Sequence, residues 1–158
     1  MVAFLQRPRS PYIQEGLARV MFVNGHYHWA LFHYRRSRRD PVCRKLSELG
    51  MGLCWLRLGK HAQALEQCLA LEQSLGTETL AAVATAQLHY TIGACSVALG
   101  RREEALARYD RLLPLYPNWA GLLRDKIVER WPESAVDLPP PAPVDDDGSP
   151  GAPDSSGS

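Results

Sequence analysis

The sequence predicts an all-α fold built from repeated pairs of helices, and three regularities support that prediction. Three glycines, Gly25, Gly59 and Gly100, each end an apolar stretch of helical character, and they stand 34 and 41 residues apart. Small residues recur at fixed distances from them: Ala18, Gly52 and Gly93 lie seven residues before, and Ala30, Ala64 and Ala105 lie five residues after. Nine residues after the glycines stand Tyr34, Cys68 and Tyr109, and Pro41 and Pro117 close two of the units.

Each of these residue types has a physical role in a stack of helical hairpins. Small residues allow two helices to approach closely, and a glycine permits the tight turn between them. An aromatic residue in the second helix fills the junction with the next hairpin. A proline begins the turn or helix that follows.

This pattern resembles the tetratricopeptide repeat family, whose 34-residue unit consists of two antiparallel helices. The resemblance is strongest in the third unit, IGACSVALGRREEALARYDRLLPLYP, and it extends over most of residues 11–131. Two departures stand out. The early tryptophan of the family is replaced by Gln14, Glu48 and His89, and the second unit ends without a proline.

We therefore divide the chain into an N-terminal segment, a helical domain and a tail. The segment is 1–10, and the domain is 11–131, with units at about 11–44, 45–78 and 86–119 and a capping helix at 119–131. A solenoid needs such a helix to cover its last unit. The seven extra residues 79–85, TLAAVAT, predict an extended first helix in the third unit, with Thr77 or Thr79 as its N-cap. We expect Asn118 to cap the last helix.

The tail, residues 132–158, contains six acidic residues, no basic residue and seven prolines. It has few bulky apolar side chains to offset the entropy of ordering, so we predict that it is disordered. The rest of the chain carries a net charge of +7, although the whole chain carries only +1. A basic body with an acidic tail suggests an acidic partner or a tail that shields its own body.

The cysteines and the hydropathy bear on cellular location. Cys43, Cys54, Cys68 and Cys95 form no CxxC pair and have no zinc spacing. We expect these cysteines to be reduced and buried as small core residues, and the protein to be cytoplasmic. Because no run of about 18 apolar residues occurs, we expect no membrane span.

The histidine-rich stretch HYHWALFHYRRSRRDP, residues 26–41, is the first candidate for a metal site. On a helix the neighbouring positions are three and four residues apart, and His26, His28 and His33 are not so spaced. We therefore expect no metal. The chain also has no phosphate-binding loop, nucleophile elbow or HExxH motif, so we expect no enzyme activity and no cofactor.

The family resemblance implies a ligand groove along the first helices of the units. Carried onto this sequence, the candidate groove residues are Tyr12, Glu15, Arg19, Leu46, Leu49, Leu53, Leu56, Arg57, Tyr90 and Val97. The Lys and Asn that clamp acidic chaperone tails in some family members are replaced by Glu15 and Arg19 in the first unit and by leucines in the second. We therefore do not expect chaperone tails as ligands. The leucines predict an apolar groove, unless they are buried among the helices.

A second candidate surface is the basic patch of Arg35, Arg36, Arg38, Arg39, Arg44 and Lys45. It suits an acidic partner segment, nucleic acid or anionic lipid. It equally suits a solvated helix end that attracts the chain's own acidic tail. No aromatic platform or groove-binding helix accompanies it, so we do not expect specific nucleic-acid recognition.

The sequence thus favours a non-catalytic adaptor or assembly chaperone that binds an apolar or amphipathic helical segment of another protein. One alternative is a small secretion-type chaperone for an exported cargo. Another is a charge-driven regulator that associates with nucleic acid or membrane through Arg35–Lys45. Homodimerisation is left open, because fold does not fix function or assembly.

Overall fold

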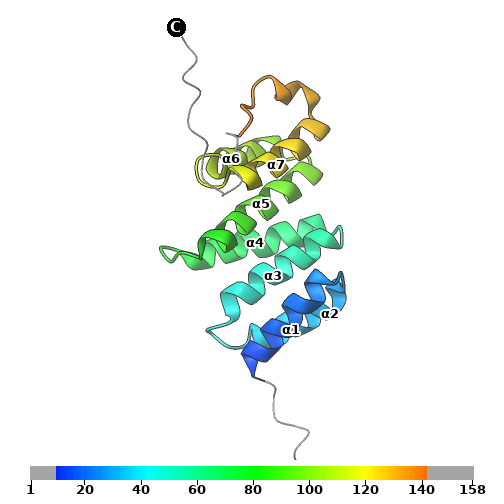
Figure 1. Cartoon of the computed structure of the whole chain (residues 1–158), viewed down its shortest axis with the longest axis vertical. Coiled ribbons are helices and arrows are strands. Elements are labelled where there is room, and N and C mark those ends of the chain that lie inside the picture. The colour runs from blue at the N-terminus through cyan, green and yellow to red at the C-terminus, as the bar shows by residue number, and fades with distance from the viewer. Residues whose placement is uncertain (1–9, 142–158) are drawn as a thin grey trace, which may run out of the picture.

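A computed structural model describes residues 10–141, which form seven α-helices and one short 3₁₀ helix (Figure 1). The helices are α1 (Pro11–Val23), α2 (Tyr27–Ser37), α3 (Arg44–Arg57), α4 (His61–Leu75), α5 (Ala82–Ala98), α6 (Arg102–Leu112) and α7 (Pro117–Arg130), followed by the 3₁₀ helix η2 (Pro132–Ala135). No strand occurs within the described range. The predicted all-α class is confirmed.

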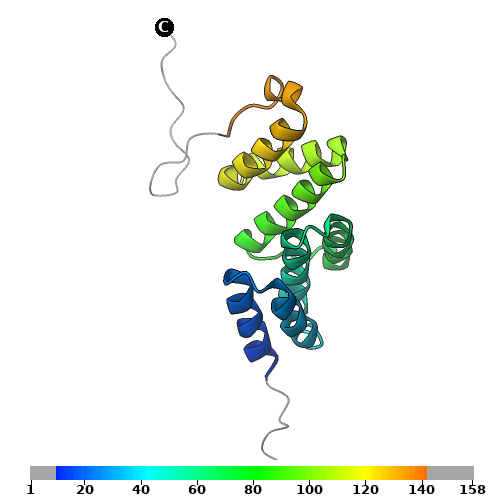
Figure 2. The ribbon, with the colours of Figure 1, turned by 90° about the vertical axis from the view of Figure 1, so that its right-hand side faces the viewer.

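The helices pair along the chain and the pairs stack on one another. Helix α1 packs on α2, α3 on α4, and α5 on α6, while α2, α4 and α6 each also pack on the helix that follows. The odd-numbered helices contact one another in turn, α1 with α3, α3 with α5 and α5 with α7. The result is an elongated stack with α1 and α2 at one end and α7 at the other (Figures 1 and 2).

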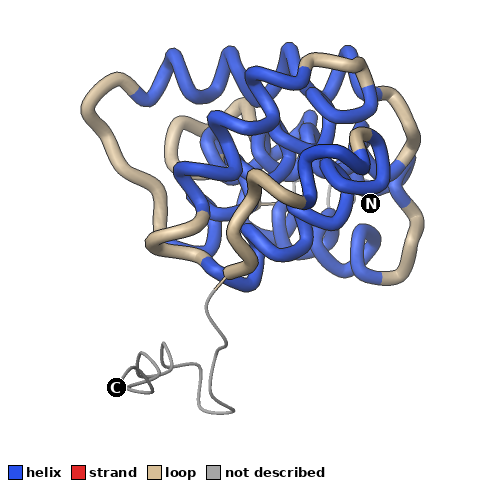
Figure 3. The backbone as a smooth tube through the Cα atoms, turned by 90° about the horizontal axis from the view of Figure 1, so that it is seen from above, coloured by secondary structure: helices blue, strands red, loops and turns tan. Residues whose placement is uncertain are grey.

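The same turn occurs between the helices of all three pairs. Gly25, Gly59 and Gly100 have φ values of 79°, 73° and 74°, in the left-handed region that glycine adopts without steric cost. The amide of Gly25 donates to Phe22 and that of His26 to Met21, and the other two turns repeat these hydrogen bonds at the equivalent positions. This is the Schellman motif. Each second helix starts directly after it, so short connections join the helices (Figure 3).

Small residues mark where the helices of a pair approach most closely. Ala18, Ala30, Ala64 and Ala105 are fully buried. A Cβ added to Gly52 would overlap the Sγ atom of Cys68 on the neighbouring helix. One added to Gly50 would overlap the ring of Tyr34, so this aromatic residue fills the junction between α2 and α3, as the sequence predicts. The core consists of three apolar clusters along the stack, the first around Tyr34, the second around Leu71 and the third around Tyr109.

Polar pairs occupy the positions where the tetratricopeptide pattern would place a tryptophan. Gln14 of α1 lies 2.8 Å from the Nδ1 atom of His33 on α2. At the equivalent positions of the third pair, the Nη1 atom of Arg108 lies 3.0 Å from Nδ1 of His89. The departure from the family pattern is therefore matched by a hydrogen bond across the first and third hairpins.

The pair in the third hairpin belongs to a larger charged cluster. The buried guanidinium of Arg108 donates to both carboxylate oxygens of Glu72 on α4, at 2.5 and 2.9 Å, and to Glu104 at 2.9 Å. The hydrogen bond from Arg108 lowers the pKa of Glu72. Burial, reinforced by the neighbouring Arg108 charge, lowers the pKa of His89. The cluster joins α4, α5 and α6 by fixed hydrogen bonds rather than by apolar packing alone.

Two predicted helix starts are wrong. Helix α5 begins at Ala82, not at Thr77 or Thr79, so residues 79–81 lie outside the helix. In this segment Leu80 packs on the second core cluster. At 17 residues α5 is still the longest of the helices. Helix α7 begins at Pro117 with Tyr116 as its N-cap, so Asn118 lies inside the first turn. Proline favours the first helical position because its missing amide would have no partner there.

Residues 132–141 pack on the helical domain, although the sequence predicts disorder from residue 132 onward. Leu138 is buried in the third core cluster, and the hydroxyl of Tyr109 donates to the carbonyl of Pro139. Arg124 donates to the carbonyl of Leu138 at 3.2 Å. A single buried leucine and these hydrogen bonds hold the segment on α6 and α7 despite its high proline content. The remaining predicted tail, 142–158, and the segment 1–9 lie outside the described residues.

The charged cluster predicts that acidification destabilises the fold. The pKa of His89 lies below its ordinary value of 6.5 and that of Glu72 below 4.5. As the pH falls through each ordinary value, the unfolded chain therefore takes up protons before the folded chain does. Stability should be full above pH 6.5, fall first through His89 and fall further through Glu72 below pH 4.5. Urea unfolding from pH 8 to pH 4 measures this. His89→Gln should flatten the first decrease, whereas His28→Gln, at an exposed position, should not; equal profiles for the two variants would contradict the assignment.

The packed segment after α7 makes a second prediction. Leu138→Ala should lower the free energy of unfolding by about 2 kcal/mol, since it removes a buried leucine from the third core cluster. Val136→Ala, two residues away at a side chain that is 90% exposed, is the matched control and should change it by less than about 0.5 kcal/mol. Chemical denaturation gives both values. A Leu138→Ala variant as stable as the control would show that the segment does not pack as described.

Candidate functional site

The inner face of the stack is formed by the odd-numbered helices, and it is hollowed in two places. These helices follow one another along one side of the molecule, with α2, α4 and α6 behind them (Figure 2). One hollow lies over α1, α3 and the start of α5. The other lies between the C-terminal ends of α3 and α5, the start of α4 and the end of α7. We call them the apolar hollow and the basic hollow.

The apolar hollow has a volume of about 390 Å³ and is walled mainly by aliphatic side chains. Val23, Leu46 and Val83 are 83%, 48% and 64% exposed, so a substantial apolar area faces solvent here. Leu49 forms the buried floor, and Leu53 is half-buried. At the rim the Arg19 guanidinium lies 3.9 Å from the Glu15 carboxylate, one turn apart on α1. The hollow offers apolar contact with a single ion pair at its edge.

The basic hollow has a volume of about 430 Å³ and a different chemical character. Its floor is Leu56, Ala94, Val97 and Ala98, and its rim carries His61, Lys126, Glu129 and Arg130. Lys126 and Arg130 stand one turn apart on α7, so both can face the same space. The Nδ1 atom of His61 is buried and has no hydrogen-bond partner among the described residues. The two cations outnumber the Glu129 carboxylate at the rim, which favours an anionic group in this hollow.

The predicted groove residues divide between these places. Glu15, Arg19, Leu46, Leu49 and Leu53 line the apolar hollow, and Leu56 and Val97 line the basic hollow. Tyr12, Arg57 and Tyr90 line neither.

The three residues outside the hollows have other surroundings. Tyr12 is exposed at the start of α1, and Arg57 is exposed at the end of α3. The ring of Tyr90 packs on Trp119 of α7 with 5.3 Å between centroids, and burial raises the pKa of its phenol. The four predicted groove leucines of α3 differ in exposure. Leu46 is exposed, Leu53 and Leu56 are half-buried, and Leu49 belongs to the core.

Several lining residues lie outside the predicted set. Val83 comes from the additional segment 79–85, and Lys126, Glu129 and Arg130 come from α7. The carry-over from the repeat positions of three units could not include them, because neither segment belongs to a regular unit. The i, i+4 spacing of Lys126 and Arg130 is the one sequence feature that places both on one side of a helix.

The basic patch is exposed along most of its length, yet most of its cations already have partners. The Arg35 guanidinium lies 5.7 Å from the Trp55 ring centroid, and that of Arg36 lies 5.4 Å from the Phe32 centroid. Lys45 forms an ion pair with Glu78, and Arg44 donates to the backbone carbonyl of Arg38 at 3.4 Å. Arg38 points toward the Met51 sulfur at 4.0 Å. The patch is thus integrated with α3 and with its own helix.

The histidines of the opening stretch and the cysteines do not assemble into a site. Within residues 10–141 no three His, Cys, Asp or Glu side chains are grouped closely enough to hold a metal ion. The four cysteines are free and buried, as predicted. Burial raises the pKa of the Cys54, Cys68 and Cys95 thiols to about 12, so these thiols are unreactive in the folded chain.

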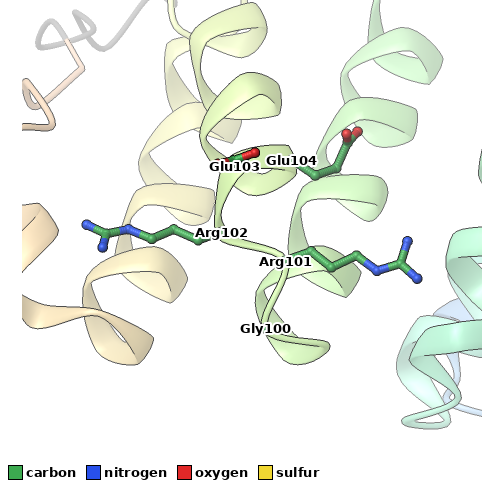
Figure 4. A pocket seen from close by; sticks show the side chains of 5 residues that line it. All are labelled: Gly100, Arg101, Arg102, Glu103 and Glu104. Carbon is green, nitrogen blue, oxygen red and sulfur yellow. The ribbon is translucent and has the colours of Figure 1, made fainter.

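A further hollow of about 540 Å³ surrounds the start of α6 (Figure 4). Its two arginines, Arg101 and Arg102, point in opposite directions. Arg102 lies 3.2 Å from Glu133 and 2.8 Å from Ser134, so it anchors η2. The polar groups here do not converge on one point, and we assign no site to this hollow.

No helix in the described part of the chain is long and apolar enough to cross a membrane. Comparison with known proteins found no matching family model, no similar curated protein and no similar solved structure.

Proposed function

We propose that the chain is a tetratricopeptide-like solenoid that acts as a non-catalytic protein-binding module, an adaptor or assembly chaperone. Its partner segment lies along the inner face, across the apolar and basic hollows. The repeated Schellman turns, the small residues at the hairpin contacts and the stacking of the odd-numbered helices support the solenoid assignment. The protein-binding role rests on the exposed apolar side chains of the apolar hollow.

Exposed apolar area in a concave place is the observation that carries this proposal. Leu46 and Val83 come from helices that are not adjacent in the sequence, and Val23 completes the rim from α1. Isolated exposed apolar residues are common on protein surfaces, but a convergent group around a hollow marks binding sites. An amphipathic helix would bury its apolar stripe on such a surface.

The two hollows together suggest the chemistry of the partner segment. Apolar side chains would occupy the hollow over α1, α3 and α5. An acidic side chain near one end of the segment would meet Lys126 and Arg130. We therefore propose a segment with two or three apolar residues and an aspartate or glutamate on one side of them.

A small secretion-type chaperone would use the same inner face, with the apolar segment of an exported cargo as its ligand. The charge-driven regulator is less well supported. Stacking on Trp55 and Phe32 and the ion pair with Glu78 engage Arg35, Arg36 and Lys45 within the chain. The two classes differ in salt dependence, because binding through counterion release collapses as salt rises.

A displayed-peptide library tests the proposed partner chemistry. Peptides enriched on the wild-type protein should contain apolar residues at helical spacing with an acidic residue to one side. Val83→Glu and Leu46→Glu should weaken a selected peptide at least tenfold by titration, since each places a charge in an apolar contact. Changing salt from 50 to 300 mM should alter its affinity by less than about threefold, because the contact is mostly apolar.

Leu115→Glu, at a side chain that is 71% exposed and outside both hollows, is the control and should bind as the wild type does. The double variant Lys126→Glu/Arg130→Glu should reverse the preference from acidic to basic residues and leave the apolar preference intact. If Val83→Glu and Leu46→Glu bind the selected peptides as tightly as Leu115→Glu does, the inner face is not the binding site.

A further inference from the structure

The N-terminal end of the stack exposes a helix face that is covered in every later hairpin. In α3 the face toward α2 carries Ser47, Gly50, Met51 and Cys54, and all four are buried. In α5 the face toward α4 carries Leu88, Thr91, Ile92 and Cys95, each at most 2% exposed. The glycine spacing makes these two sets equivalent. In each case the preceding even-numbered helix packs on them.

The equivalent residues of α1 are Ile13, Gly16, Leu17 and Val20, 34 positions before those of α3. Ile13 and Val20 are 54% and 55% exposed, and Leu17 is half-buried. A Cβ added to Gly16 would meet nothing within 4 Å, whereas Gly50 accepts the ring of Tyr34. Helix α1 thus has an empty notch of the form that an aromatic ring fills on α3.

Exposed aromatic rings lie on α2 of the same hairpin. Trp29 and Phe32 are 62% and 45% exposed, with 6.1 Å between their ring centroids. The equivalent positions hold Gln63 and Glu66 on α4 and Glu104 and Ala107 on α6, so the aromatic pair is peculiar to the first hairpin. A hollow of about 440 Å³, lined by Met21, His26, Trp29 and His33, lies between the Trp29 ring and the end of α1. The end of the stack therefore carries both a notch and aromatic rings.

We propose that the face is covered by a second copy of this chain, in a two-fold dimer formed by the α1–α2 hairpins. A two-fold interface brings the same patch of both subunits together, so it requires a self-complementary surface. The Gly16 notch and the Trp29 and Phe32 rings provide that complementarity within one hairpin. Arg36 covers the Phe32 ring at the edge of the patch, and the patch has no acidic residue among the side chains that form it.

The size of the face sets the expected strength. Helices of 13 and 11 residues give a footprint on the order of 400 Å² per subunit. This is about half the contribution of each partner to a standard stable interface. The dimer should therefore dissociate in the micromolar range rather than be permanent.

Sedimentation velocity between 5 and 500 μM tests the proposal with the full chain. The wild type should pass from monomer to dimer, and Gly16→Trp should weaken the association at least tenfold. Because an added side chain at Gly16 meets open space in the monomer, this variant should keep its helical circular dichroism. Val83→Glu, which alters the apolar hollow, should dimerise as the wild type does. This pairing separates failure of the dimer from failure of the proposed partner site.

Disulfide capture provides the positional test. Val20→Cys places an exposed thiol within the proposed interface, one turn from Gly16, while the four native cysteines are buried. Mild oxidation at 200 μM should give a covalent dimer with Val20→Cys and much less with Val83→Cys. A wild type that stays monomeric at 500 μM overturns the proposal. So does association that Gly16→Trp leaves unchanged, or that weakens tenfold between 50 and 500 mM salt, as a charge-driven contact would.

Discussion

The close approach of two helices across a left-handed glycine is the constraint on which the rest of this structure depends. In each of the three turns one glycine adopts the left-handed conformation, which other residues rarely adopt. The second helix starts directly afterwards. So short a connection forces the helices into contact, and the buried alanines leave room for it. The turn is repeated with the same hydrogen bonds, so all three hairpins have the same connection between their helices. The inner face, along which the odd-numbered helices contact one another in turn, follows from this repetition.

Repetition also explains which features of the fold could be predicted from sequence. The glycines, the small residues and Tyr34 mark contacts made at fixed offsets, so their spacing predicted the hairpins and an aromatic residue at the junction with the next hairpin. That the ring of Tyr34 lies against Gly50 is known only from the structure. The starts of α5 and α7 depend on single local contacts, such as Leu80 on the core and Pro117 at the first helical position. Spacing contains no information about these. Leu138 was missed for a related reason, since one buried leucine in a proline-rich segment has no periodicity to reveal it.

The candidate site was predictable to the extent that it belongs to the repeat. Leu46, Leu49 and Leu53 line the apolar hollow because their positions recur on the first helix of each unit. Their individual exposure was not predictable, because it depends on how far α1 and α5 cover α3. Val83 and the α7 cations lie in segments without a regular counterpart, so only the three-dimensional arrangement brings them to the inner face. The chemical asymmetry between the two hollows is thus a product of the irregular parts of the chain.

The two ends of the stack differ in a way that a regular repeat would not produce. At the C-terminal end α7 covers the last hairpin, and Leu138 and the bond from Tyr109 to Pro139 hold a further segment in place. At the other end α1 keeps the small and apolar residues of an internal helix without a preceding helix on them, and α2 adds two exposed rings. A terminal hairpin in water would be expected to have polar residues there. At the positions of the two rings α4 has Gln63 and Glu66, and α6 has Glu104 and Ala107. The apolar residues at this uncovered end are the observation on which the proposed dimer rests, and in that dimer the α1–α2 hairpin of a second copy supplies the covering helix.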